Sequence, residues 1–237
     1  MKPLISWSIV IHNQASLLKN LLISFTKLNY ENYEIIITIN VKENIQFLKK
    51  FDYLNIKIIT NKKIKGFGEN HNFAFTLANG TFFGVINPDI TFTKFNINLL
   101  IHNLKNNINI GVCAPKVVSP EGFIQETARE FPTIYEYFKR FMSNNFKERK
   151  KNAVYWIGGM FMLFRKSAFR KVNGFDPYFF LYMEDVDICK RLIENQYLVT
   201  YIPETFVVHD ARRLSRKKLF FLYLHVISII KYFTKHR

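Results

Sequence analysis

The first strand and helix of the fold can be read from residues 8–25, SIVIHNQASLLKNLLISF. Ser8-Ile9-Val10-Ile11 is a short apolar run of mostly β-branched side chains, which predicts a buried strand. Apolar residues then recur at helical spacing, at Leu17, Leu18, Leu21, Leu22 and Phe25. A strand followed by a helix is the repeating unit of an α/β fold.

The same alternation continues along the first half of the chain. Strands are expected at three further apolar stretches, residues 34–40, 56–60 and 81–86. Helices are expected between and after them, at residues 45–51, 70–77 and 96–105. Strands that alternate with helices form a parallel sheet, and such sheets bind ligands at the carboxyl ends of their strands. We therefore expect a central, mostly parallel sheet flanked by helices.

The rhythm changes beyond residue 110. Strands are expected at residues 111–118, 197–202 and 206–209, and helices at residues 166–172 and 184–195. Residues 154–165 are apolar around Gly158-Gly159. Residues 138–151 are basic and poor in aliphatic side chains, which is typical of a solvated loop.

Composition narrows the class of protein. The 237 residues include 34 lysines and arginines against 18 acids, a net charge of +16, and 49% of them are hydrophobic. A chain that can fill so large a core is neither disordered nor a disulfide-stapled mini-protein. Cys113 and Cys189 lack the spacing of a zinc site, which favours a reducing compartment. With no signal sequence expected at residues 1–6, the cytoplasm is the expected location.

Asn87-Pro88-Asp89 is the first candidate site, because it follows a buried strand. Pro88 favours an extended Asn87, so the strand should end there with polar side chains at the edge of the sheet. A carboxylate at that place can hold a divalent cation, which can neutralise a diphosphate. An isolated Asn-Pro-Asp is more often an Asx-type turn. His209, at the end of another strand, is either a metal ligand or a strand-terminal histidine.

Gly66-Phe67-Gly68-Glu69-Asn70-His71-Asn72 is the second candidate site. Its glycines let the backbone approach a ligand, and amides at a helix start can hold a sugar or phosphate. The third glycine of a dinucleotide fingerprint is missing, and no Gly-Lys-Ser/Thr follows. Taken alone, the stretch fits an ordinary glycine turn and helix cap better than a ligand site.

Glu184-Asp185-Val186-Asp187 is the third candidate site. Three acids within four residues repel one another, which raises at least one pKa and can produce a general base. Acids at a helix start are also favoured by the helix dipole, so the two interpretations are evenly matched.

The order and spacing of these stretches resemble the family 2 glycosyltransferases, especially their rhamnosyltransferase-like branch. The resemblance spans nearly the whole chain, and its most specific part is Glu184-Asp185-Val186-Asp187-Ile188-Cys189-x-Arg191. The other matching elements are Gly66 to Asn72, Asn87 to Asp89, Gly158-Gly159 with Arg165, Gly174 to Asp176, Phe179-Phe180, Pro203 and His209.

The resemblance implies a GT-A (Rossmann-like) fold and a metal-dependent hexosyltransferase that inverts the transferred sugar. Residues 1–110 would bind a nucleotide-sugar donor, residues 111–211 would bind a saccharide or lipid-linked saccharide acceptor, and residues 212–237 would form a basic helical tail. Surface-polysaccharide assembly would be the process served.

Roles for individual residues follow from the same resemblance. Asp185 would be the catalytic base, and Asp89 with His209 would bind Mg²⁺ or Mn²⁺. The donor would contact Asn13, Asn40, Gly66, Gly68, Asn70, Asn72, Asn87, Asp89 and Arg129. The acceptor would contact Trp156, Gly158, Gly159 and Glu184. The competing interpretations are a buried core residue for Trp156 and an ordinary basic surface residue for Arg129.

The sequence departs from the family pattern at three places. His12-Asn13-Gln14 follows the first strand, where the family usually has a Tyr-Asn turn. Ile39-Asn40 follows the second strand, where an Asp-Asn pair usually meets the nucleoside. Asn87 stands where the family often has an acid. The donor is therefore expected to meet fewer acids here.

The tail suggests a peripheral membrane contact. Residues 219–230 are apolar but shorter than the ~20 residues that cross a bilayer. The basic residues around them are Arg212, Arg213, Arg216, Lys217, Lys218, Lys231, Lys235 and Arg237. An amphipathic helix of this kind can lie on the anionic inner face of the cell membrane. The competing interpretation packs Leu219, Leu222 and Val226 against the catalytic domain.

Two other classes of function remain open at this point. A nucleic-acid-binding protein would suit the positive charge and the many aromatic residues, but no recognisable binding motif is present, so no specific nucleic acid is expected. A degenerate transferase that binds a saccharide or a partner protein without turnover would suit Ile39 and Asn87.

Overall fold

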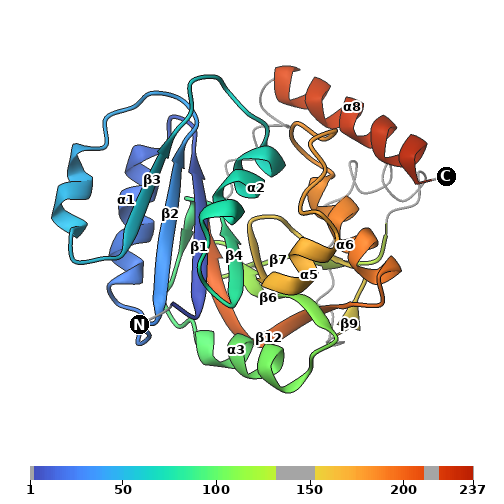
Figure 1. The fold of residues 1–237 in the computed structure, drawn as a ribbon, viewed down its shortest axis with the longest axis horizontal. Helices are drawn as coiled ribbons and strands as arrows, with labels where there is room; N and C mark the ends of the chain where they lie inside the picture. Colours follow the sequence, from blue (N-terminus) through green and yellow to red (C-terminus); the bar gives the residue numbers. More distant parts are fainter. Residues whose placement is uncertain (1–2, 132–152, 211–218, 237) are drawn as a thin grey trace.

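The computed structural model describes residues 3–131, 153–210 and 219–236 (Figure 1). The basic stretch at residues 138–151 and the basic residues 212–218 lie outside the described residues. The strands of the main sheet are β1 (Ile5–Ile11), β2 (Tyr33–Ile39), β3 (Ile56–Thr60), β4 (Phe82–Ile86), β5 (Ile90–Thr91), β6 (Ile110–Val118), β7 (Ile124–Gln125), β9 (Ala153–Val154), β11 (Phe161–Arg165) and β12 (Leu198–His209).

The sheet is parallel in its first half and mixed in its second. The order is β3-β2-β1-β4-β11-β6-β12-β5, with β7 beside β6 and β9 beside β12. Strands β1 to β4 are parallel, whereas β11 runs antiparallel to both β4 and β6. A separate pair consists of β8 (Ala128–Arg129) and β10 (Trp156–Ile157). The α/β class is therefore confirmed, with an antiparallel strand inserted at the centre.

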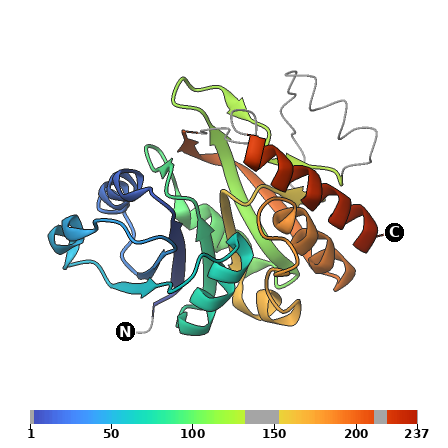
Figure 2. The ribbon, with the colours of Figure 1, turned by 90° about the horizontal axis from the view of Figure 1, so that it is seen from above.

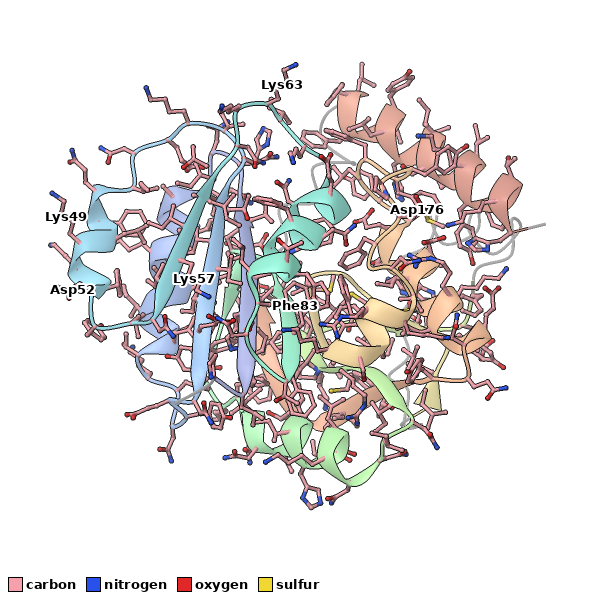
Figure 3. All side chains as sticks on the ribbon, viewed as in Figure 1. Lys49, Asp52, Lys57, Lys63, Phe83 and Asp176 are labelled. Carbon is pink, nitrogen blue, oxygen red and sulfur yellow. The ribbon has the colours of Figure 1, made fainter. Side chains whose placement is uncertain are left out.

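Helices cover both faces of this sheet (Figures 1 and 2). They are α1 (Ala15–Phe25), the 3-10 helix η1 (Gln46–Phe51), α2 (Phe67–Leu77), α3 (Ile97–Asn106), α5 (Lys166–Lys171), α6 (Glu184–Glu194) and α8 (Leu219–Lys235). One apolar core joins Ile9 of β1 to α1 and α3, and the other joins Phe83 of β4 to α2, α5 and α6. Phe83 lies at the centre of the molecule (Figure 3).

The core is packed tightly where β1 meets β4. Trp7 is fully buried and lies opposite Gly84 in the register of the two strands. A Cβ atom at Gly84 would lie 2.1 Å from Cε3 of the indole ring of Trp7. Glycine at this position therefore makes room for a large aromatic side chain between two central strands.

Most expected elements of the first half are present within one or two residues, whereas β1 and α2 each begin three residues before their expected starts. The strands expected at residues 197–202 and 206–209 form one strand, β12, whose register shifts between Ile202 and Phe206. Pro203 lies at this irregularity, which is where a strand tolerates the missing N–H of proline.

The expected C-terminal helix exists as α8, and it packs beside α6 (Figure 2). It does not pack through Leu219 and Val226, which are 85% and 46% exposed. Ser228 and Tyr232, on the other side of the helix, are buried instead. Leu222 is half-buried, so the packing interpretation was wrong for Leu219 and Val226, and the face that meets the domain is the one with Ser228 and Tyr232. Within the described residues, no helix is both long and apolar enough to cross a bilayer.

Candidate active site

The candidate site is built around Gly159, where three distant segments meet. The end of β4 is tied to this segment because the N–H of Asn87 donates to the carbonyl of Met160 at 2.9 Å. The start of α6 is tied to it because the N–H of Gly159 donates to Asp185 Oδ2 at 2.9 Å. A Cβ at Gly159 would lie 3.6 Å from the ring of Phe67 in α2. The segments expected to bind donor and acceptor therefore converge here.

Asp185 is half-buried at the first turn of α6. Burial raises the pKa of Asp185, whereas the N–H groups of Gly159 and Val186 and the charge of Arg129 lower it. The net direction is upward. A partly accessible carboxylate with a raised pKa is a stronger base than an exposed aspartate, which suits the abstraction of a hydroxyl proton.

Glu184 is only 5% exposed, and its Oε2 atom has no hydrogen-bond partner among the described residues. Burial raises the pKa of Glu184 well above its ordinary value, and the charges of Asp185 and Asp187 raise it further. A carboxyl group in such surroundings favours its neutral form. The φ angles of Tyr182 and Met183, 70° and 67°, place both residues in the left-handed region just before this acid.

Both carboxylate oxygens of Asp187 are held by partners within the protein. It is fully buried, and Oδ2 lies 2.7 Å from a guanidinium nitrogen of Arg191. Its Oδ1 atom accepts from Lys235 Nζ at 2.6 Å and lies 2.8 Å from His236 Nε2. Because these partners occupy both oxygens, Asp187 anchors α8 and is unsuited to act as a base.

Asp89 and His209 are brought together by the pairing of β5 with β12, in which Ile90 lies opposite His209. Asp89 Oδ1 lies 3.4 Å from His209 Nε2, and this buried oxygen has no hydrogen-bond partner among the described residues. Gln125 fixes the imidazole: its Nε2 donates to the His209 carbonyl at 2.8 Å, and its Oε1 lies 2.8 Å from Nδ1.

The Nε2 atom of His209 faces the unpartnered Oδ1 atom of Asp89. An amide oxygen only accepts, so Nδ1 of His209 is the nitrogen that donates to Gln125, and Nε2 is the nitrogen turned toward Asp89. An orienting hydrogen bond on the far nitrogen is typical of metal-ligating histidines. The pair therefore fits a divalent cation. Within the described ranges no third His, Cys, Asp or Glu joins it.

The glycine-rich turn packs against the 174–180 segment. Cβ atoms at Gly66 and Gly68 would lie 2.7 Å from the Phe180 carbonyl oxygen and 2.5 Å from Cβ of Phe175. Asn72 holds the same segment, because Nδ2 donates to the Phe175 carbonyl and Oδ1 accepts from the Phe175 N–H. Close packing therefore explains both glycines, and the Asn72 amide is engaged within the protein.

Asn40 and Asn70 are buried and hold the loop that leads to α2. Asn70 Nδ2 donates to the Gly66 carbonyl at 2.8 Å. Asn40 exchanges two hydrogen bonds with the backbone of Lys65, and Asn61 bonds to both asparagines. Sequence reasoning missed Asn61 and Lys65, because nothing local marks them. These side chains shape the rim at the ends of β2 and β3.

Asn13 lies in the left-handed region, with φ of 58°, between β1 and α1. Its N–H donates to Glu43, whose carboxylate also accepts from the N–H groups of Gln14 and Ala15. Glu43 therefore supplies a carboxylate at this end of the sheet, where Ile39 replaces the aspartate that is usual in the family. It was not predicted, because it lies beyond the end of the strand.

Arg129 and Trp156 lie side by side on β8 and β10. The guanidinium carbon of Arg129 lies 5.1 Å from the centre of the indole ring, and Trp156 Nε1 donates to the Glu130 carbonyl at 2.9 Å. Gly158 continues this wall, because its N–H donates to the Thr127 carbonyl. Trp156 is only 9% exposed and belongs to the apolar core, and Gly158 is buried too, so these two residues support the site from within and do not present an open stacking surface. Among the residues expected to meet the acceptor, Gly159 contacts Asp185 directly.

Comparison with known proteins gives consistent results. The model described as glycosyl transferase family 2 matches residues 6–172, and that described as N-terminal domain of galactosyltransferase matches residues 139–214. Rhamnosyltransferase WbbL of Escherichia coli K12 is 27% identical over 97% of this chain and 92% of its own length. An N-acetylglucosaminyl-diphospho-decaprenol L-rhamnosyltransferase of Mycobacterium tuberculosis is 30% identical over 53% of this chain.

The chain spans 45% of the length of that mycobacterial relative. Among solved structures, the mannosyltransferase PcManGT from Pyrobaculum calidifontis, in complex with GDP-Man and Mn²⁺, has a TM-score of 0.66 at 13% identity. The match covers 90% of this chain and 59% of that protein. A likeness of this kind shows the fold, and it confirms the expected GT-A architecture.

Proposed function

The chain belongs to glycosyl transferase family 2, and we propose that it transfers a sugar from a nucleotide-sugar donor to a hydroxyl group of a saccharide or lipid-linked saccharide, with inversion. The observation that carries this proposal is the contact of Gly159 with Asp185, next to the end of β4 that bears Asp89. Residues 1–110 form the donor half in this proposal, and residues 111–211 form the acceptor half.

Asp185 acts as the general base. The acceptor oxygen forms a bond to the anomeric carbon of the donor while the bond from that carbon to the diphosphate breaks. The hydroxyl proton passes to the Asp185 carboxylate. One displacement from the face opposite the leaving group inverts the anomeric configuration. A positioned base of this kind contributes about 10²–10⁴ in rate.

Asp89 and His209 would hold Mg²⁺ or Mn²⁺, which would supply positive charge to the departing diphosphate. The supporting observations are the unpartnered Asp89 Oδ1 and the oriented Nε2 of His209. The Mn²⁺ bound by the mannosyltransferase PcManGT is consistent with a divalent cation in this fold. Gln125 keeps the His209 ring in place for this role.

The acceptor would approach Asp185 beside Gly159, with the buried Trp156 and the Arg129 guanidinium that lies over it supporting this wall from behind. The charge of Arg129 also lowers the pKa of Asp185. The relative from Mycobacterium tuberculosis is named for a lipid-linked saccharide acceptor. We extend this acceptor class to the present chain and place its work at the inner face of the cell membrane, in surface-polysaccharide assembly.

A donor screen followed by a transfer assay tests this function. UDP-, dTDP-, GDP- and CMP-sugars are added with Mn²⁺, and the melting temperature is measured. One nucleotide class should raise it, and the same donor should then glycosylate a polyprenyl-diphosphate saccharide. Binding without product on any acceptor of this class would instead support a saccharide-binding protein without turnover. No binding of any donor would contradict both.

The Asp89→Asn variant tests the cation site separately. It should fold normally, because Asp89 Oδ1 has no hydrogen-bond partner to lose within the described chain. It should also lose the part of the melting-temperature rise that requires Mn²⁺. An equal Mn²⁺-dependent rise in the variant and the wild type would contradict the assignment.

A further inference from the structure

Helix α8 has apolar side chains on its outward face. Leu219, Tyr223, Val226 and Ile230 recur at intervals of four, three and four residues, so they line one side of the helix. Their exposed fractions are 85%, 61%, 46% and 60%. Phe220 adds a further exposed ring beside this stripe. An exposed apolar stripe of this length is typical of an interaction surface.

The inward face of α8 is bound to the segment that precedes Asp185. Ser228 Oγ donates to the Leu181 carbonyl at 2.7 Å, and Lys231 Nζ donates to the Tyr178 carbonyl at 2.7 Å. Lys235 Nζ bridges Asp176 and Asp187, at 2.6 Å from an oxygen of each. Asp176 lies beneath α8 in Figure 3. The inward face of α8 therefore holds residues 176–183 in place through these bonds.

The charge of this part of the chain selects the partner. Residues 211–237 contain eight lysines and arginines and no aspartate or glutamate. A second copy docked through the same face would bring two such tails together, and like charges disfavour that contact. An anionic lipid surface offers both a layer for the apolar stripe and charge that complements the tail.

We propose that the outward stripe of α8 docks on an anionic lipid surface, and that the inward face transmits this contact to the segment holding Asp185. The first half concerns a partner and stands without catalysis. The second half rests on the proposed role of Asp185 as the base. Docking would hold residues 176–183 in place next to the membrane, where a lipid-linked acceptor is found.

Sedimentation with vesicles tests the docking. The wild type should bind phosphatidylglycerol vesicles, and added salt should weaken this binding. The Val226→Ser/Ile230→Ser variant should bind about tenfold more weakly, because both side chains would lose their contact with lipid. The matched control is Ile58→Ser/Ile108→Ser, two exposed isoleucines outside α8, which should bind like the wild type.

Equal binding by Val226→Ser/Ile230→Ser and the wild type would overturn the proposal. The proposal would also be overturned if the wild type bound phosphatidylcholine and phosphatidylglycerol vesicles equally well, because the negative charge of the lipid would then have no role. A wild-type dimer in sedimentation velocity that the α8 variant loses, without lipid binding, would assign the stripe to a second copy instead.

Hydrogen exchange tests the second half without any substrate. Amides of residues 176–187 should exchange severalfold more slowly when the wild type binds phosphatidylglycerol vesicles, and the α8 variant should show no such change. Vesicle binding that leaves this exchange unchanged would contradict the transmission. Neither readout requires turnover, so failure of the transferase function would be seen separately in the donor screen.

Discussion

Glu184, Asp185 and Asp187 are adjacent acids that the fold places in three different environments. Asp187 has cationic partners on both oxygens, Glu184 is buried with an unpartnered oxygen, and Asp185 is half-buried and bonded to Gly159. Similar residues thereby acquire separate environments: Asp187 anchors α8, Glu184 is a carboxyl group that favours its neutral form, and Asp185 is the proposed base. The sequence shows that the three acids are clustered, but only their surroundings in the fold distinguish what each of them can do.

Replacing Glu184 by glutamine should stabilise the protein at high pH. Burial and the neighbouring acids raise the pKa of Glu184 in the folded state. The folded protein therefore loses stability as the pH rises from the pKa of an unfolded glutamate to the raised pKa of Glu184. Glutamine has nearly the same shape and no charge. The free energy of unfolding should rise by about 1 kcal/mol or more at pH 8, and the gain should disappear near pH 4, where both states carry the proton.

Urea unfolding at the two pH values measures this difference. A loss of stability in Glu184→Gln at pH 8 would show that the charged form of Glu184 is favoured by contacts, contrary to the geometry described above. Asp52→Asn, which removes a carboxylate from the exposed end of η1, serves as the control and should be nearly neutral at both pH values.

Replacing Gly84 by alanine should destabilise the core between β1 and β4. The added methyl group would overlap the indole ring of Trp7, which is fully buried. We expect the free energy of unfolding to fall by about 1–3 kcal/mol. Gly122→Ala is not an equivalent control because the φ of Gly122 is +87°, so Ser16→Ala, at an exposed position of α1, is used. A neutral Gly84→Ala would contradict the packing of this strand pair.

At the scale of elements, α6 and α8 act as one unit joined by charge. Lys235 reaches Asp187 at the start of α6 and Asp176 in the turn that precedes it. Asp187 is fully buried, and the charged side chains of Arg191 and Lys235 compensate for the hydration that its carboxylate loses. The orientation of α6, and with it the position of Asp185, therefore depends on Lys235, which lies 48 residues after Asp187 in the chain.

Replacing Lys235 by methionine removes this charge and keeps most of the side-chain stem. Asp187 would retain Arg191 and His236, and Lys235 is itself partly exposed, so the free energy of unfolding should fall by about 1–2 kcal/mol. Lys235→Arg should recover most of the loss, because arginine can also bridge two carboxylates. Chemical denaturation measures both, with the exposed Lys105→Met as the control. Equal stability of Lys235→Met and Lys105→Met would exclude the bridge.

At the scale of the whole molecule, the sequence predicted the strand and helix alternation of the first half well, because periodicity is a local property. It did not predict that β11 runs antiparallel between β4 and β6, or that Gln125 orients His209. Such features depend on contacts between residues far apart in the chain, for which a single sequence carries no signal. The roles of the Asn-Pro-Asp and Glu-Asp motifs were assigned by resemblance. The hydrogen bonds that Asn40, Asn70 and Asn72 make to the backbone of other residues are seen only in the folded structure.

The proposed site unites Asp89 and Asp185 through the backbone of Gly159 and Met160. The most direct measurement of this claim compares the transfer rate and the donor affinity of Asp185→Asn with those of the wild type, at saturating Mn²⁺. The rate should fall by about 10²-fold or more, while the dissociation constant of the donor stays within about twofold. An unchanged transfer rate in a folded Asp185→Asn protein would contradict the account.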